Sequence, residues 1–399
     1  MIRTRFREND PAHFREDPVA FIVNMGAYYQ GAGWRSHKNY IGSRYFYEGY
    51  STAMKDKVLK SKRVQDCISK LAERQAELLN QTATVAVSPT DEKKRLKQQR
   101  ALERELEAVA RGIADKCFAR MDDVRVLRLF AFAVNNILVR LYHQGIHIKE
   151  SEFVVLRNAA IEAERSRRSL ILLPSHKSHV DYLVISYVFF RLGIALPHIA
   201  AGDNLDMPIV GGILKGSGAF FIRRVWGDDL MYKAVLDEYM EALLQAGREY
   251  IWRVMTGRAE VYGYQMNVSL NRGSTCILTY SFIDNIECFI EGTRSRTGKL
   301  LTPKLGILKI ILESVISGGA RDAIIVPISI GYDKVIETST YMTELLGNPK
   351  ERESLWSIMT GTRVLQWKWG SIDVRVAKPW SLRSWIDEQI EIRKWVLFQ

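Results

Sequence analysis

The hydrophobic positions of this chain follow two different periods, and the change between them falls near residue 150. Residues 56–81, 91–118 and 123–142 carry apolar side chains three and four positions apart amid dense charge, which predicts amphipathic helices. The Ser-Pro-Thr-Asp sequence at 88–91 is typical of a loop that leads into a helix. We therefore predict a helical N-terminal domain over residues 1–145.

From residue 150 onward, short apolar runs bounded by Gly and Pro alternate with helical segments. This alternation predicts an α/β domain over residues 146–399, in which a central, largely parallel sheet is flanked by helices. In such sheets the functional site lies beyond the carboxyl ends of the strands, which is where the polar residues of these runs fall. The expected strands are 168–174, 197–202, 218–224, 286–292 and 323–333, and the expected helices are 178–192, 228–246 and 304–317.

The composition is that of a globular protein with anionic partners. Of the 399 residues, 47% are hydrophobic and 26% are charged, so we expect a buried core rather than global disorder. The formal net charge of +12 favours nucleic acid, an acidic membrane surface, or phosphorylated and CoA-type substrates. The four cysteines are scattered without metal-ligand spacing, so we expect reduced thiols of a non-secreted protein and no metal site.

Neither a secretory leader nor a membrane span is expected. The N-terminal sequence lacks an apolar segment, and no run of about 18–20 uncharged apolar residues occurs. Contact with a membrane would therefore be peripheral. A stretch of aromatic and basic residues at 33–50 fits membrane headgroups or a surface between domains as well as nucleic acid, and we expect no nucleic-acid partner.

The sequence Leu-Leu-Pro-Ser-His-Lys-Ser-His-Val-Asp-Tyr-Leu at 172–183 places His176 and Asp181 five positions apart between two hydrophobic segments. On one α-helix such positions lie about 140° apart, so these side chains can pair only if the histidine precedes the helix. Pro174 ends the preceding strand and Ser178 fits the N-cap of the next helix, which would leave His176 outside it. Asp181 would then orient one imidazole nitrogen and leave the other as a general base. The alternative is that Asp181 only caps the helix and His176 is an ordinary turn residue.

Three further motifs follow expected strands. Arg223 and Arg224 end one hydrophobic strand, where paired arginines suggest that an anion or a carboxylate lies nearby. The loop at 291–299, Glu-Gly-Thr-Arg-Ser-Arg-Thr-Gly-Lys, combines arginine forks with backbone N–H groups, which suit a phosphate dianion. Pro327 lies within a buried run, which suggests an edge strand or a bulge that lines a cavity. Each motif is a weak signal alone, but four at successive strand ends together predict a site.

These four motifs, taken in order, resemble the four sequence blocks of the glycerol-phosphate acyltransferases. The resemblance is to the branch that holds the large glycerol-3-phosphate acyltransferases and the dihydroxyacetone-phosphate acyltransferases, and it covers about residues 150–385. It implies direct transfer of a fatty acyl group from acyl-CoA, or from acyl carrier protein, to the sn-1 hydroxyl of glycerol 3-phosphate. The product would be lysophosphatidic acid, formed in the first step of glycerophospholipid synthesis. Acyl-CoA would be a co-substrate, and we expect no cofactor, metal or covalent enzyme intermediate.

The resemblance also implies roles for the matched residues. His176 would take the proton of the attacking hydroxyl, and Asp181 would hold and polarise His176. Glu291 would fix its loop or bind a glycerol hydroxyl. The expected phosphate ligands are Arg224, Arg294 and Ser295, with Arg223, Arg296 and Lys304 as secondary contributors around the backbone of Gly292, and Pro327 marks the fourth block.

One spacing departs from this family. From Arg224 to Glu291 is 67 residues, about twice the usual separation, and the excess falls at about 249–284. We interpret this segment as a surface insertion or, alternatively, as a translated intron.

Other functions stay open on the sequence alone. Dihydroxyacetone phosphate differs from glycerol 3-phosphate only at C2, and its use would point to ether-lipid synthesis; we expect glycerol 3-phosphate. A lysophospholipid acceptor is a further alternative, and so is an inactive, membrane-associated scaffold, which the intact set His176, Asp181, Arg224, Glu291 and Arg294 disfavours. We expect an intracellular, membrane-associated protein, and the motifs do not distinguish the mitochondrial outer membrane, the endoplasmic reticulum and the peroxisome.

Overall fold

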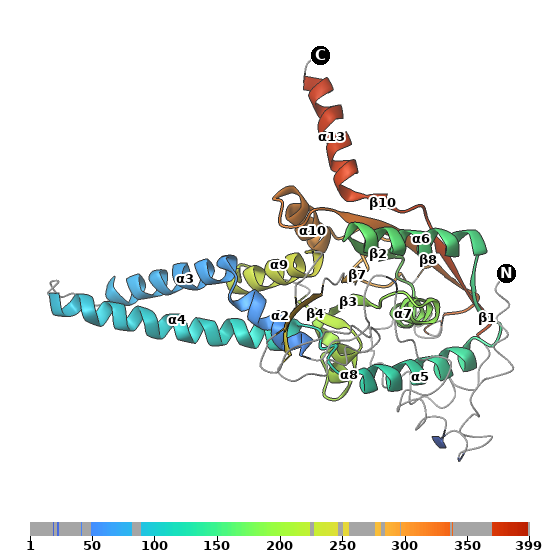
Figure 1. Ribbon diagram of the computed structural model, residues 1–399, viewed down its shortest axis with the longest axis horizontal. Coiled ribbons are helices and arrows are strands. Elements are labelled where there is room, and N and C mark those ends of the chain that lie inside the picture. The colour runs from blue at the N-terminus through green and yellow to red at the C-terminus, as the bar shows by residue number, and fades with distance from the viewer. Residues whose placement is uncertain are drawn as a thin grey trace. The chain divides into compact units, whose positions relative to one another are not determined.

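Figure 1 shows the computed structural model of the chain, which describes residues 49–81, 89–223, 227–245, 250–254, 276–280, 284–295, 297–335, 337 and 369–397 and the single positions 19, 22, 23 and 41. The contacts divide the chain into two compact units. Unit 1 comprises residues 1–45, 123–199 and 244–399, and unit 2 comprises residues 46–122 and 200–243. Both units draw on segments from either side of residue 145, and the predicted domain division there stays a prediction.

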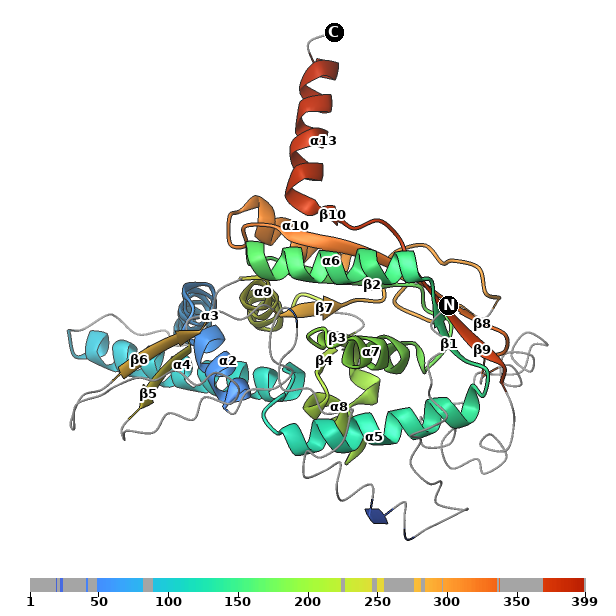
Figure 2. The ribbon, with the colours of Figure 1, turned by 45° about the vertical axis from the view of Figure 1, so that its right-hand side comes forward.

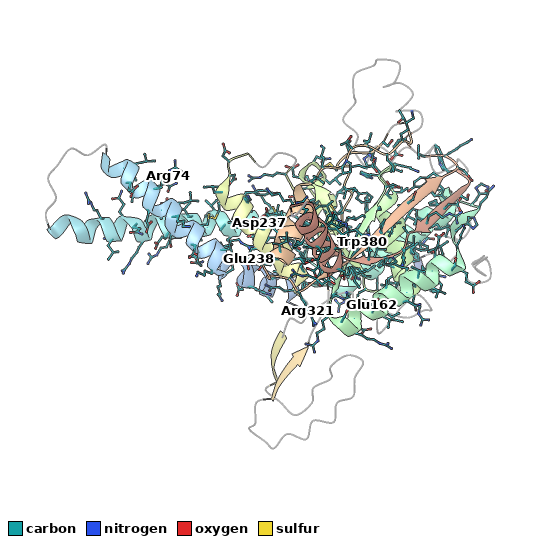
Figure 3. The ribbon with its side chains drawn as sticks, turned by 90° about the horizontal axis from the view of Figure 1, so that it is seen from above. Arg74, Glu162, Asp237, Glu238, Arg321 and Trp380 are labelled. Carbon is teal, nitrogen blue, oxygen red and sulfur yellow. The ribbon has the colours of Figure 1, made fainter. Side chains whose placement is uncertain are left out.

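Unit 2 consists mainly of helices. The predicted helix 56–81 is two helices, because the Ser61 hydroxyl accepts the N–H of Val64 at 3.3 Å and caps the second one. Arg63 of that helix pairs at 3.2 Å with Glu238, which Figure 3 labels on α9. The elements are α2 (Tyr50–Leu59), α3 (Lys62–Gln81), α4 (Pro89–Cys117), η1 (Asp203–Leu205), α8 (Val210–Gly216), β4 (Ala219–Ile222) and α9 (Leu230–Leu244).

Unit 1 is built on a mixed sheet whose strands follow the order β1-β9-β8-β2-β7-β3. The pairs β1–β9, β2–β8, β2–β7 and β3–β7 are parallel, whereas β9 and β10 run antiparallel to β8. The predicted α/β fold with a largely parallel sheet is therefore confirmed, and the five predicted strands are present as β2, β3, β4, β7 and β8. The strands are β1 (Gly145–Ile148), β2 (Ser169–Pro174), β3 (Pro197–Gly202), β7 (Asn285–Glu287), β8 (Ala323–Tyr332), β9 (Ser371–Val376) and β10 (Trp380–Ser381).

Helices cover both faces of this sheet, as buried parallel strands require. Figure 2 shows α6 on one face and α7 on the other, with α5 beyond α7. Leu170 and Leu172 of β2 are fully buried in the same core as Val184 of α7. None of the described helices is both long and apolar enough to cross a bilayer. The helices are α5 (Val124–Leu141), α6 (Glu150–Ser166), α7 (Asp181–Leu192), α10 (Gly306–Ile316) and α13 (Leu382–Leu397).

Pro327 lies in β8, but the prediction that it marks an edge strand is wrong. β8 runs between β2 on one side and β9 with β10 on the other. The proline lies where the antiparallel neighbour changes, because β9 pairs with β8 from Ile328 onward and β10 pairs with it up to Ile325. Pro has no N–H to give to a ladder, and its carbonyl accepts the N–H of Ala377 at 3.0 Å in the connection between these neighbours. A central strand therefore accommodates the proline at this position.

A second, two-stranded antiparallel sheet is formed by β5 (Tyr250–Val254) and β6 (Cys276–Tyr280). Both strands lie in the predicted insertion at about 249–284, whose residues 255–275 and 281–283 lie outside the described residues. The interpretation of this segment as an insertion stays a prediction.

Candidate active site

The loop at 175–180 carries the candidate base from the end of β2 to the start of α7. Because α7 begins at Asp181, His176 lies outside the helix, as the spacing predicts. The Nδ1 atom of His176 lies 2.9 Å from Oδ2 of Asp181. Asp181 is fully buried, whereas the His176 side chain keeps 19% of its surface exposed. The predicted histidine–carboxylate pair is present, with one ring nitrogen engaged and the ring accessible to solvent.

Asp181 receives four hydrogen bonds. Its Oδ2 accepts the backbone N–H groups of Lys177 at 2.7 Å and Ser178 at 2.9 Å in addition to the ring of His176. Its Oδ1 accepts the hydroxyl of Tyr332, and burial together with the charge of Asp181 raises the pKa of that phenol. Because a carboxylate can only accept, the proton of neutral His176 lies on Nδ1 and the lone pair lies on Nε2.

Ser178 does not cap α7, contrary to the prediction. The N-cap position is Val180, and residues 178–180 form a turn in which the N–H of Asp181 bonds to the carbonyl of Ser178 at 3.3 Å. The turn places Ser178 two residues ahead of the N-cap. Its hydroxyl instead lies 2.9 Å from a carboxylate oxygen of Glu337, to which it donates.

The backbone of His176 is held from both sides by the loop that follows β7. The N–H of His176 donates to Oε1 of Glu291 at 3.0 Å, and its carbonyl accepts the N–H of Ser295 at 2.8 Å. The ring of Phe289 packs on the imidazole, with ring centroids 4.2 Å apart and a tilt of 35°. The first and third sequence motifs therefore meet in space, and the orientation of the imidazole depends on both.

The loop at 291–304 is internally braced. The second carboxylate oxygen of Glu291 accepts the N–H of Leu301 at 3.0 Å, and Glu291 is buried. Ser295 is also buried, and its hydroxyl donates to the carbonyl of Lys299. The N–H of Lys304 donates to the carbonyl of Ile290 at 2.6 Å, which closes the loop. Glu291 therefore fixes this loop to the loop at 175–180, and fixing its loop is one of the two roles predicted for it.

Gly292 occupies a position that other residues would not fill easily. Its φ of +63° lies in the left-handed region, and a Cβ there would approach Cδ of Lys304 to 2.7 Å. The aliphatic part of Lys304 thus lies against the backbone where Gly292 turns, beside the predicted phosphate-binding segment.

Arg294 contacts a carboxylate that the motifs did not reveal. Its Nη1 lies 3.3 Å from Oε1 of Glu337, a residue that follows β8 and is 2% exposed. The same oxygen accepts the N–H of His179 at 2.6 Å and lies 3.1 Å from Nδ1 of its ring. Burial acts to raise the pKa of Glu337, but the hydrogen bonds and positive charges of His179 and Arg294 outweigh it, so this pKa lies below the ordinary 4.5. Glu337 is therefore a buried anion.

Glu287 of β7 is the second residue that the motifs did not reveal. It is fully buried, and neither of its carboxyl oxygens has a hydrogen-bond partner among the described residues. Burial, and next the charge of Asp181, raise the pKa of this carboxyl well above 4.5. Burial and the proximity of Glu287 also raise the pKa of the Cys288 thiol to about 12. The carboxyl of Glu287 therefore holds its proton more strongly than an ordinary glutamate does.

The remaining predicted residues are Arg223, Arg224 and Arg296. Arg223 lies in unit 2, where it pairs with Asp229 at 2.7 Å and stacks over the ring of Tyr232 at 4.3 Å. Arg224 and Arg296 lie outside the described residues. The phosphate-binding roles of the predicted ligands stay predictions.

The geometry suits proton removal from a hydroxyl. A neutral imidazole with its Nδ1–H on a buried carboxylate presents Nε2 as an acceptor, and the carboxylate stabilises the positive charge that forms when Nε2 takes a proton. Within the described part of the chain, no three His, Cys, Asp or Glu side chains are grouped so that they could hold a metal ion.

Two family models match this chain. Residues 156–331 match the family described as acyltransferase, and residues 341–395 match the glycerol-3-phosphate acyltransferase C-terminal region. The first match contains His176, Asp181 and the loop at 291–304, whereas Tyr332 and Glu337 lie beyond its end.

Curated relatives carry the same two substrate names. A dihydroxyacetone phosphate acyltransferase of Bos taurus is 36% identical over 259 residues, which are 65% of this chain and 32% of that protein. A glycerol-3-phosphate acyltransferase of Ectopseudomonas mendocina is 36% identical over 220 residues, which are 55% of this chain and 22% of that protein. The chain thus spans about a third or less of the length of these relatives.

A solved structure, the 1-acyl-sn-glycerophosphate acyltransferase PlsC from Thermotoga maritima, aligns with 68% of this chain and 80% of its own. The identity is 16% and the TM-score is 0.32, a similarity too low to add to the argument.

Proposed function

We propose that this chain acylates the primary hydroxyl of a glycerol phosphate. The proposal is supported by the match of residues 156–331 to the acyltransferase family and of residues 341–395 to the C-terminal region of glycerol-3-phosphate acyltransferases. The proposed donor is a fatty acyl-CoA and the proposed acceptor is glycerol 3-phosphate, so that lysophosphatidic acid is the product. The observation that carries the proposal is the 2.9 Å contact between Nδ1 of His176 and Oδ2 of Asp181, next to an arginine-bearing loop.

In this reaction His176 is the general base. Its Nε2 accepts the proton of the acceptor hydroxyl while the hydroxyl oxygen bonds to the carbonyl carbon of the thioester. The bond from that carbon to sulfur then breaks, and the proton on His176 passes to the departing CoA thiolate. A positioned base of this kind contributes roughly 10²–10⁴-fold to the rate, and the orientation of both substrates supplies the rest.

The proposed phosphate site is the loop at 291–304. Support comes from the bond between the N–H of Ser295 and the carbonyl of His176, which keeps this loop next to the base. Arg294 is the described guanidinium closest in sequence to that contact, and guanidinium groups bind phosphate oxygens in pairs. The other proposed ligands are Arg224 and Ser295, with Arg223, Arg296 and Lys304 as secondary contributors around the backbone of Gly292.

Dihydroxyacetone phosphate is the second candidate acceptor. The observation that favours it is the length of the match, since the bovine relative with that name aligns with 65% of this chain, against 55% for the bacterial glycerol-3-phosphate acyltransferase. We retain glycerol 3-phosphate because the segments at 197–208 and 291–304 resemble that side of the family more closely. A site that hydrogen-bonds a C2 hydroxyl would discriminate strongly against the ketone.

The test is kcat/KM for both acceptors with palmitoyl-CoA, measured on the full chain and on a variant that lacks residues 249–284. Palmitoyl-acyl carrier protein serves as the alternative donor. We expect transfer to glycerol 3-phosphate by both proteins and none by His176→Ala, with the circular dichroism of His176→Ala unchanged. A preference for dihydroxyacetone phosphate would move the chain to that reaction. Absence of transfer to either acceptor would favour an inactive scaffold.

The proposal includes peripheral contact with an intracellular membrane. The net charge of +12 and the acyl chains of the donor and product support this contact. Co-sedimentation with vesicles that contain about a third anionic lipid should exceed that with neutral vesicles and should decrease with added salt.

A further inference from the structure

Glu337 links two segments that the proposed reaction uses for different purposes. One is the turn between His176 and Asp181, which contributes the hydroxyl of Ser178 and the N–H of His179. The other is the loop after β7, which contributes the guanidinium of Arg294. A single buried carboxylate therefore receives donors from the catalytic turn and from the proposed phosphate-binding loop.

The contact with Arg294 restricts the direction of its guanidinium. This group is rigid and planar, so a contact at one Nη atom limits the directions in which its other N–H groups can point. The Arg294 side chain is 13% exposed, which further limits its rotamers. Glu337 lowers the net positive charge near the phosphate, so its contribution there must come from orientation rather than from attraction.

The contacts with Ser178 and His179 act on the base. Asp181 binds the N–H groups of Lys177 and Ser178, and Glu337 binds the next N–H along the chain, that of His179. Three consecutive backbone N–H groups thus point at two carboxylates. The position of His176, which leads into this run, depends on both anions.

We propose that Glu337 is a positioning residue that orients Arg294 toward the phosphate of the acceptor and at the same time holds the turn that presents His176. This inference rests on the proposed function of the site, since it takes Arg294 as a phosphate ligand. Glu337 itself contacts neither substrate. Its removal should therefore change acceptor binding through Arg294 and the chemical step through the turn.

Asp322 provides a matched control on the other end of β8. It is also a buried carboxylate, and it likewise accepts an arginine (Arg168, 2.8 Å), a serine hydroxyl (Ser381, 2.7 Å) and a backbone N–H (Arg383, 2.8 Å). Asp322 precedes the first residue of β8, whereas Glu337 follows the last. Neutralising either carboxylate removes the same kind of interaction, but only Glu337 adjoins the site.

The test compares Glu337→Gln, Arg294→Ala, the double variant and Asp322→Asn by calorimetric titration with glycerol 3-phosphate and with inorganic phosphate. We expect Glu337→Gln to weaken the binding of both ligands about tenfold, which is a coupling within the range found for contacting residues. When Arg294 is already alanine, Glu337→Gln should not weaken the binding of either ligand further. Asp322→Asn should bind both ligands like the wild type. In steady-state assays Glu337→Gln should also lower kcat, with the KM for acyl-CoA unchanged, whereas Arg294→Ala should mainly raise the KM for the acceptor.

Several outcomes would overturn this role for Glu337. The first is that Glu337→Gln binds phosphate as the wild type does. The second is that Glu337→Gln weakens phosphate binding as much in the Arg294→Ala background as in the wild type. The third is that Asp322→Asn weakens phosphate binding as much as Glu337→Gln does. If Glu337→Gln does not fold, Glu337→Asp keeps the charge, withdraws it by one methylene and carries the same expectations. Phosphate binding with the expected coupling but no acyl transfer would sustain the role of Glu337 and remove the proposed function. Acyl transfer without coupling between Glu337 and Arg294 would sustain the proposed function and remove the role of Glu337.

Discussion

Replacement of Asp181 by asparagine removes the charge behind the candidate base while keeping its shape. The asparagine carbonyl can take the place of Oδ2 and accept from His176, Lys177 and Ser178, which now bond to Asp181 at 2.7–2.9 Å. The amide NH₂ then faces the hydroxyl of Tyr332, whose oxygen can accept a hydrogen bond. All four contacts can persist, so the variant tests the charge rather than the packing.

The expected loss of stability follows from those four contacts. A hydrogen bond to a charged group contributes about 1.5–3 kcal/mol and a neutral one about 0.5–1.5 kcal/mol, so each contact loses about 1 kcal/mol and the four together at most about 4 kcal/mol. Relief of the penalty for burying an anion, which amounts to several kcal/mol, offsets part of this loss. We expect the free energy of unfolding to decrease by about 1–3 kcal/mol.

The effect on catalysis should be larger. An imidazolium that faces a neutral amide is less stable than one that faces a carboxylate, so His176 becomes a poorer base. We expect kcat to decrease by about 10²–10⁴-fold, which is the range that general-base catalysis contributes. The assay is palmitoyl transfer to glycerol 3-phosphate under saturating substrates, on protein whose folded fraction is known from urea unfolding.

Tyr332→Phe is the matched control, because it removes a donor from the same carboxylate and leaves the pair of His176 and Asp181 intact. It should lose about 1 kcal/mol of stability and keep kcat within a few-fold of the wild type. A folded Asp181→Asn protein with wild-type kcat would refute the reasoning and leave Asp181 with a structural role only.

Two further variants test the surroundings of the site. Because the pKa of Glu287 lies well above 4.5, the folded protein keeps a proton there that the unfolded chain releases above that pH. The free energy of unfolding of the wild type should therefore decrease relative to that of Glu287→Gln by about 1.4 kcal/mol per pH unit above 4.5, for as long as the folded carboxyl stays protonated. Urea unfolding of both proteins from about pH 5 to about pH 7 measures this difference. A difference that does not change with pH would contradict the prediction. Gly292→Ala should raise the KM for the acceptor more than Gly298→Ala does. Both glycines have positive φ, but only a Cβ at position 292 would meet Lys304. Equal KM values for the two variants would contradict this steric argument.

Features with a local cause could be predicted from the sequence. The run at 168–174 is apolar because β2 is covered by helices on both faces, and Pro174 is its last residue. The spacing of His176 and Asp181 permits their pairing once the histidine precedes the helix, since both then lie at the ends of one short turn. The contact of that turn with the loop at 291–299 could be expected because the carboxyl ends of parallel strands meet at one edge.

Features that depend on distant partners could not be predicted. Tyr332 lies 151 positions from Asp181, and Glu337 lies 159 positions from Ser178. The local capping pattern gave the wrong N-cap because the helix begins at Asp181, two residues later than the pattern places it, while the Ser178 hydroxyl donates to Glu337 and accepts the N–H of Val180 at 3.4 Å. Glu287 has the same difficulty, because a glutamate within Ile-Glu-Cys-Phe-Ile-Glu-Gly gives no sign of which strand neighbours will bury it. The one sequence feature that could have indicated Glu337 is the position of an acidic residue shortly after the end of a core strand.

Three of the buried carboxyl groups of this region, those of Asp181, Glu287 and Glu337, differ in the hydrogen-bond donors that they receive. Asp181 receives N–H and hydroxyl donors, and Glu337 receives Arg294 and His179, so each can remain an anion away from water. Glu287 has no hydrogen-bond donor among the described residues and lies in the field of Asp181. A third anion there would be buried without compensation, which is far more costly than keeping the proton. The low-dielectric surroundings that raise the pKa of Glu287 thus also strengthen the interaction of Asp181 with His176.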